Sequence, residues 1–211
     1  MKSTFSLPLV LTVIITGFLG FSTYQRNKIW MSEINLWNDA CKKSWNKARP
    51  FDALGNAYED NRMYDKAIEA YREAIKRDPA YVKAYNNIGY LYFSVGLDDK
   101  AKNLYLKALH LAPSYSVAHN NLGNVYLRKG REFYELAIKH FKMAIELKPT
   151  YAEACLNLGN TYLGQKLYDR ALEQYEKALN LRPDYEKAKL NMESIAQFEK
   201  YGDRAKIELV Y

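Results

Sequence analysis

The stretch KAYNNIGYLYFSVGLDDKAKNLYLKALHLAP, residues 83–113, decides how the whole chain is read, because close copies of it recur along the sequence. A glycine in phrases such as NIGYLY returns with spacings of 34, 34 and 36 residues, and a proline that closes each copy returns with spacings of 34, 36 and 34. The two-residue excess falls between Gly130 and Ala137, where a loop tolerates it at little entropic cost. A fixed period of this length predicts a repeat architecture. The recurring glycines are Gly55, Gly89, Gly123 and Gly159, and the recurring prolines are Pro79, Pro113, Pro149 and Pro183.

Each copy carries the apolar pattern of two helices. The second half places an alanine, an aromatic residue four positions later and another alanine three positions after that, which forms one stripe on a helix. The closing proline then ends that helix. We expect the glycine of the first half to allow close approach of the paired helix. No single copy can bury its own apolar face, so four copies in a stack would share one core. The stripes begin at Ala67, Ala101, Ala137 and Ala171.

A 34-residue helix-turn-helix period with these phrases resembles the tetratricopeptide repeat, and the resemblance covers residues 48 to about 200. It implies an all-α tetratricopeptide-repeat (TPR) α-solenoid, a right-handed superhelix of paired helices. Residues 186–200 follow the register of a first helix but carry charges at packing positions, which is typical of a solvating cap. Residues 25–47 fit a half repeat, with Trp30, Ile34 and Trp37 on one apolar face; alternatively, the tryptophans form an interfacial belt at a membrane. The expected repeats are 48–81, 82–115, 116–151 and 152–185, with a tail at 201–211.

The amino-terminal segment predicts a membrane anchor. Residues 5–22, FSLPLVLTVIITGFLGFS, contain no charge and as a helix would span about 27 Å, close to the thickness of a bilayer core. We therefore interpret residues 1–24 as a transmembrane signal-anchor helix that contacts lipid through residues 5–22. Cleavage near Gly20 to Ser22 is the alternative. Positive charges flank both ends, so the positive-inside comparison does not settle the orientation.

Asparagines recur at the repeat period on the side that the tetratricopeptide resemblance assigns to the concave groove. A side-chain amide can donate and accept, so such a series could bind the backbone of an extended peptide. It resembles the asparagine ladder in the repeat domain of O-GlcNAc transferase. Alternatively, these amides satisfy neighbouring groups of the protein itself. Tyr90 and Phe93 add apolar surface to the expected groove. The asparagines are Asn56, Asn86, Asn87, Asn120, Asn121, Asn124, Asn157, Asn160 and Asn191.

The sequence contains no pattern that indicates nucleic-acid binding, catalysis, or metal or cofactor binding. The net charge is +7, but lysines alternate with acidic residues, which indicates solvated helix faces and not a nucleic-acid surface. No nucleophile elbow, P-loop, HExxH or dinucleotide fingerprint occurs, so we predict a non-enzyme without metal or small-molecule cofactor. His119 and Cys155 occupy packing positions and are expected in the core.

Three functions remain open. The junction TYQRNKIWMSEINLWNDACKKSWNKARPFDALGNAYED, residues 23–60, resembles that of membrane proteins of the transmembrane O-mannosyltransferase-like group, whose repeats lie outside the cytoplasm. The leading hypothesis is a membrane-anchored TPR scaffold, facing the periplasm or extracytoplasmic space, that binds a protein or peptide and mediates complex assembly. The alternatives are the substrate-binding tail of a membrane glycosyltransferase and a structural subunit of a pilus or secretion apparatus.

Overall fold

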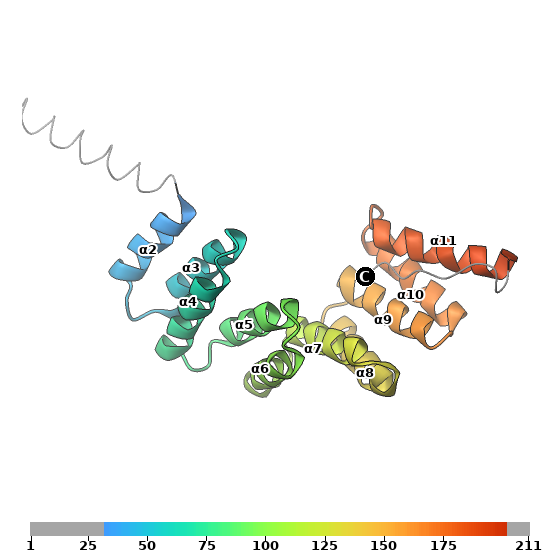
Figure 1. The fold of residues 1–211 in the computed structure, drawn as a ribbon, viewed down its shortest axis with the longest axis horizontal. Coiled ribbons are helices and arrows are strands. Elements are labelled where there is room, and N and C mark those ends of the chain that lie inside the picture. Colours follow the sequence, from blue (N-terminus) through green and yellow to red (C-terminus); the bar gives the residue numbers. More distant parts are fainter. Residues whose placement is uncertain (1–31, 202–211) are drawn as a thin grey trace, which may run out of the picture. The chain divides into compact units, whose positions relative to one another are not determined.

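The computed structural model describes residues 32–201, and every regular element in that range is a helix (Figure 1). The prediction of an all-α fold is therefore confirmed for the described part of the chain. The predicted half repeat contributes α2, the four expected repeats contribute a helix pair each, and α11 follows them. The elements are α2 (Glu33–Lys43), α3 (Ala48–Asp60), α4 (Tyr64–Arg77), α5 (Val82–Ser94), α6 (Asp98–Leu111), α7 (Ser116–Lys129), the short 3-10 helix η1 (Arg131–Phe133), α8 (Tyr134–Leu147), α9 (Ala152–Gly164), α10 (Tyr168–Leu181) and α11 (Glu186–Tyr201).

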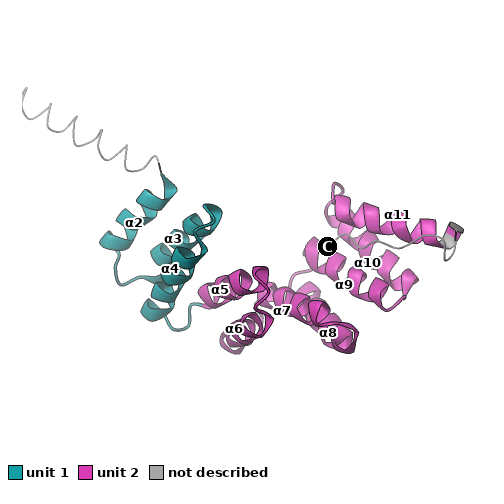
Figure 2. Ribbon diagram, viewed as in Figure 1, with its two compact units in different colours: residues 1–81 teal, residues 82–211 magenta. Residues whose placement is uncertain are grey.

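The chain divides into two compact units, residues 1–81 and residues 82–211 (Figure 2). In the first unit α2 packs on α3, and α3 packs on α4. In the second unit each helix from α5 to α11 packs on the next one along the chain. Neighbour-on-neighbour packing is what a repeat stack requires, because each repeat buries its apolar face only against the adjacent one.

An aromatic ring occupies the space that each repeat glycine leaves open. A Cβ atom added to Gly159 would lie 2.5 Å from Cε1 of Tyr175, and one added to Gly123 would lie 2.6 Å from Cε1 of Phe141. The same contact joins Gly89 to Tyr105 at 2.7 Å. The sequence led us to expect close approach of the paired helix. The structure shows that the approaching group is the aromatic ring that lies between the two alanines of the second helix. This ring is fully buried in every repeat.

The first unit has its own small core, built partly by the half repeat. Cys41, Leu54 and Ala70 are buried together. Ile34 and Trp37 of α2 are partly buried and pack against that cluster. Burial raises the pKa of the Cys41 thiol, which suits an unreactive core residue.

Equivalent turns between paired helices place one residue in the left-handed region. Gly96 has a φ of +81°, while Arg62 and Lys166, which stand at the same position of their repeats, have φ values of 58° and 63°. Only glycine adopts this conformation without a steric penalty. In the third repeat, which has two additional residues, the three-residue helix η1 follows Gly130, so the insertion lengthens this turn and leaves the adjoining helices intact.

The predicted membrane anchor, residues 5–22, lies outside the described residues. Within residues 32–201 no helix combines the length and apolar character needed to cross a bilayer.

Candidate peptide-binding groove

In the second unit, hydrogen bonds between asparagine amides join the first helix of each repeat to the first helix of the next repeat, or to α11 after the last one. In each bond the asparagine at the sixth position of one helix donates to an asparagine on the preceding first helix. The helix pairs linked in this way are α5 with α7, α7 with α9, and α9 with α11. The bonds run from Nδ2 of Asn121 to Oδ1 of Asn86 (2.9 Å), from Nδ2 of Asn157 to Oδ1 of Asn120 (3.0 Å), and from Nδ2 of Asn191 to Oδ1 of Asn160 (2.8 Å).

Four asparagines of the expected groove are therefore buried inside the repeat stack. Asn120 and Asn191 have no exposed surface, and Asn86 and Asn160 are nearly as inaccessible. Buried amides need partners, and each of the four bonds to another asparagine through one end of its amide, although the buried Nδ2 of Asn120 has no partner among the described residues. This arrangement matches the alternative in which the asparagines satisfy neighbouring groups. We do not include these four residues among the proposed ligand contacts.

The ninth position of a first helix pairs with the tyrosine of the following second helix. The hydroxyl of Tyr175 donates to Oδ1 of Asn160 at 2.9 Å, and the hydroxyl of Tyr71 donates to Oδ1 of Asn56 at 2.7 Å. Tyr71 also lies 2.7 Å from Oε2 of Glu59. Burial and the Glu59 carboxylate raise the pKa of Tyr71 well above its usual range, so the phenol stays protonated and can donate.

This pairing fails in the two middle repeats. In the third repeat the second helix carries Phe141, which has no hydroxyl, and Asn124 forms no hydrogen bond within the described residues. In the second repeat the ninth position holds Tyr90, and the buried hydroxyl of Tyr105 has no partner among the described residues. Asn124 is partly exposed, so its amide is available to a ligand.

Asn124 lines a cavity of about 560 Å³ on the first-helix side of the second unit. Phe93 and Asn157, which the sequence also assigns to the groove, line the same cavity. Its apolar wall is formed by Leu127, Leu156 and the ring of Tyr185. We call this cavity the first-helix groove. Its lining residues are Phe93, Asn124, Leu127, Arg128, Glu153, Leu156, Asn157, Tyr185 and Lys187.

Sequence reasoning did not identify the apolar wall, although one signal was present. Leu156 stands at the fifth position of its first helix, where the two preceding repeats have Asn86 and Asn120. Because Leu156 cannot accept a hydrogen bond from α11, Asn191 bonds to Asn160 at the ninth position. The exchange of asparagine for leucine gives this end of the groove an apolar surface.

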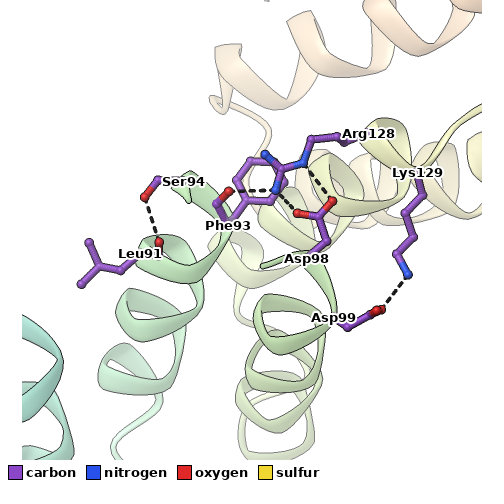
Figure 3. A network of polar contacts seen from close by, with 7 residues as sticks. All are labelled: Leu91, Phe93, Ser94, Asp98, Asp99, Arg128 and Lys129. Atoms are coloured by element: carbon purple, nitrogen blue, oxygen red, sulfur yellow. Dashed lines mark hydrogen bonds and ion pairs between the residues drawn. The ribbon is translucent and has the colours of Figure 1, made fainter. Parts of the chain in front are cut away.

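One side of the groove is held by a polar network that joins the second and third repeats (Figure 3). The guanidinium of Arg128 donates from Nη2 to the carbonyl oxygen of Phe93 at 2.8 Å and from Nε to Oδ2 of Asp98 at 3.0 Å. The same guanidinium stacks on the Phe93 ring, 3.5 Å from its centroid. Next to it, Nζ of Lys129 lies 2.7 Å from Oδ1 of Asp99. Phe93 therefore lines the cavity with one face of its ring covered by Arg128.

The other expected residues are distributed as follows. Tyr90 is 49% exposed on α5, but it is not part of the groove lining. Asn87 and Asn121 are partly buried beside the asparagine pair of α5 and α7. Asn56 is exposed and belongs to the first unit.

The rim of the groove carries charges of both signs. Burial raises the pKa of the Tyr185 hydroxyl, the nearby Glu153 carboxylate raises it further, and Arg182 opposes the shift. Tyr185 is therefore a neutral hydrogen-bonding group at ordinary pH. Glu153, Lys187 and Arg128 line the groove, and Arg128 is paired with Asp98, so the charges largely balance beside an apolar wall and neutral polar groups.

The histidines form a pair that the sequence did not reveal. Nδ1 of His119 lies 3.0 Å from Nδ1 of His140, and Nε2 of His119 lies 3.0 Å from the carbonyl oxygen of Pro113. A carbonyl only accepts, so with both rings neutral the hydrogen of His119 is on Nε2, and His140 donates from Nδ1. His119 is buried, as its packing position predicted. Within the described residues, no cluster of three or more His, Cys, Asp or Glu could hold a metal ion.

Comparisons with known proteins agree with the repeat architecture. Family models described as TPR or tetratricopeptide repeats match residues 63–96, 82–115 and 114–184. The crystal structure of MamA is 26% identical, covers 71% of this chain and 86% of its own, and has a TM-score of 0.60. No curated protein matches this chain.

Two further solved structures share the fold at lower identity. YrrB, described as a TPR protein with an unusual peptide-binding site, is 21% identical over 80% of this chain and 86% of its own, with a TM-score of 0.61. PilF of Pseudomonas aeruginosa is 21% identical over 88% of this chain and 82% of its own, with a TM-score of 0.69. The family matches together cover residues 63–184, more than half of the sequence. The chain is therefore a helical solenoid that belongs to the tetratricopeptide-repeat family.

Proposed function

We propose that this protein is a scaffold that binds an extended segment of another protein in the first-helix groove and so mediates assembly of a complex. The observation that carries the proposal is Asn124. Its amide has no hydrogen-bond partner among the described residues and stands beside an apolar wall, while the buried asparagines of the same stack bond to one another. An amide next to an apolar surface can bond to peptide backbone while a ligand side chain is buried.

The groove favours a peptide with one large apolar side chain. Leu127 and Tyr185, which are partly exposed, offer apolar contact beside the buried Leu156, and Asn124 and Asn157 offer polar contact. The rim charges of Glu153 and Lys187 would contribute mainly to orientation, because exposed charges are screened by solvent. YrrB, described as having a peptide-binding site, has the same fold, which is compatible with this function.

The proposal also includes a membrane anchor at residues 5–22 that holds the repeats at a bilayer surface, with an extracytoplasmic position suggested by the junction resemblance. An uncharged stretch of this length supports the anchor.

Selection from a random peptide library on the full chain in detergent tests the binding function. We expect enriched peptides to share an apolar residue. Leu127→Ala should weaken their binding about tenfold, because part of a buried leucine's contribution of about 1.5–3 kcal/mol is lost. Leu106→Ala, which removes an exposed leucine from α6, is the matched control and should bind normally. The function is rejected if no peptide is enriched, or if both variants bind like the unmodified chain.

A further inference from the structure

One end of the first unit combines a highly exposed tryptophan with a dense group of cations. Trp45 lies in the turn between α2 and α3, and its side chain is 70% exposed, the largest exposed fraction among the large hydrophobic residues described. The carboxyl ends of α2 and α4 and the amino end of α3 meet at this turn, because Nε of Arg77 donates to the carbonyl oxygen of Trp45 at 3.0 Å. The cations at this end are Lys42, Lys43, Lys47, Arg49, Lys76 and Arg77.

Three of the six cations form ion pairs within the described residues, and they share two carboxylates. Lys43 pairs with Asp39 at 2.6 Å, and Arg77 and Lys76 share Glu73. Lys42, Lys47 and Arg49 are exposed and have no ion pair within the described residues. Counted against Asp39, Glu73 and Asp78, the C-cap residue of α4, the six cations still leave this end with a net positive charge.

Two of the cations lie where they are unfavourable for the fold. Lys47 is the N-cap residue of α3, and Arg49 lies in its first turn, which contains no acidic residue. The amino end of a helix carries partial positive charge, so cations there are destabilising unless an external anion compensates for them. A hollow of about 330 Å³, lined by Trp45, Asn46, Lys76 and Arg77, opens at the same end.

We propose that this basic tryptophan surface, formed by Trp45 and the six cations, lies on an anionic lipid bilayer. Tryptophan favours the membrane–water interface because its ring is largely apolar while its indole N–H is polar. Lysine and arginine beside it are attracted to acidic headgroups. An acidic protein would satisfy the cations, but it would not explain a single exposed indole among them as well as a lipid interface does.

The position of the surface in the chain supports the lipid assignment. Ser32, where the described structure begins, follows the apolar stretch 5–22 by ten residues. Ten residues reach at most about 35 Å, so insertion of that stretch would keep the first unit next to the bilayer. A short tether of this kind raises the local concentration of the surface at the headgroups.

Tryptophan fluorescence of the full chain tests the proposal. The sequence has three tryptophans, so Trp30→Phe with Trp37→Phe leaves Trp45 as the sole reporter. The protein is reconstituted into vesicles of phosphatidylcholine, alone or mixed with phosphatidylglycerol, with brominated lipids as quenchers near the headgroups. We expect a blue shift and quenching of Trp45 with phosphatidylglycerol only, both reversed by high salt.

Charge-reversal variants separate lipid recognition from anchoring. Lys42→Glu with Lys47→Glu should abolish the quenching, while Lys83→Glu with Lys107→Glu, on the second unit, should leave it unchanged. Co-flotation with vesicles reports the anchor at residues 5–22 independently, and circular dichroism confirms that each variant folds. The proposal is overturned if Trp45 remains unquenched in anionic vesicles that carry the protein, if neutral vesicles quench it equally, or if the protein floats with neither lipid.

Discussion

At the level of single residues, the glycine and the aromatic ring opposite it define each repeat. The ring can lie against the first helix only because the glycine has no side chain, and in all four repeats the ring is completely buried. Because this contact between glycine and ring is present in every repeat, the glycines return in the sequence at nearly constant spacing. Any larger residue would have to displace a ring that is itself held between two helices.

Gly159→Ala should therefore destabilise the second unit by about 1–3 kcal/mol, the usual effect of overpacking a core. The added Cβ would lie 2.5 Å from Cε1 of Tyr175. Urea unfolding followed by circular dichroism measures the change. Adding Tyr175→Leu to Gly159→Ala makes room for the new methyl group, so the two substitutions together should cost less than the sum of their separate effects. Strict additivity would contradict the proposed contact.

The histidine pair makes stability depend on pH. Burial lowers the pKa of His140 to about 4, with additional contributions from His119 and Lys139. The folded state therefore binds the proton less well than the unfolded chain, whose histidine has a pKa near 6.5. This contribution to stability is fully present above about pH 6.5 and is lost as the pH falls towards 4.

We expect the unfolding free energy to fall by roughly 2 kcal/mol between pH 7 and pH 4.5 on account of His140, a value reduced for its partial exposure. His140→Phe keeps a ring against Tyr126, which stacks on His140 at 5.6 Å between centroids, but it cannot titrate. The variant should lose less stability over this range than the unmodified protein. His110→Gln, at an exposed position, is the control. An equal loss in His140→Phe would show that other groups cause the dependence.

At the level of helices and turns, the turn between the two helices of a repeat restricts the backbone conformation of one residue. The turn position that carries Gly96 in the second repeat carries Lys166 in the fourth, and both have positive φ values. Lys166 holds a conformation that costs a side-chain-bearing residue about 1 kcal/mol. The chain tolerates it because the paired helices α9 and α10 on either side determine the path of the turn.

Replacing Lys166 by glycine should accordingly stabilise the protein by about 0.5–1 kcal/mol, even though glycine is more flexible in the unfolded chain. Thermal unfolding provides the measurement. Gly96→Ala, the reverse exchange at the equivalent position, should destabilise by a similar amount. A loss of stability on Lys166→Gly would show that the lysine side chain has a role beyond its backbone conformation.

The helices were predictable from the sequence, whereas the partners of their polar groups were not. The 34-residue period, the alanine stripes and the closing prolines record local packing that recurs in every repeat, so they identify the fold directly. The periodicity of the asparagines likewise placed them on the first helices. It could not distinguish an amide that bonds to a peptide from one that bonds to the next repeat, because both functions favour the same residue at the same spacing.

The exceptions to the pattern carry the functional information. Within residues 32–201, Asn124 has no hydrogen-bond partner because Phe141 replaces a tyrosine on the other helix of its repeat. Leu156 contributes to an apolar wall because it replaces an asparagine. Each effect depends on a contact between residues far apart in the sequence. The pairing of His119 with His140 was missed for the same reason.

At the level of the whole molecule, the two units differ in what their surfaces offer. The second unit offers the first-helix groove, and the first unit carries the basic tryptophan surface. The anchor at residues 5–22 remains a prediction from the sequence. We therefore propose that one chain combines a peptide-binding unit with a lipid-binding unit.

We propose that the paired asparagines hold the stack together and that the amide of Asn124 is left to bind the ligand. The most direct test is calorimetric titration of a library-selected peptide into the variants Asn124→Ala and Asn86→Ala, at a temperature where both are folded. Asn124→Ala should weaken binding about two- to tenfold, the value of one hydrogen bond, with unchanged stability. Asn86→Ala should bind like the unmodified protein although it unfolds more easily, because Asn121, which does not line the groove, loses its acceptor. Normal binding by Asn124→Ala together with lost binding by Asn86→Ala would contradict the proposal.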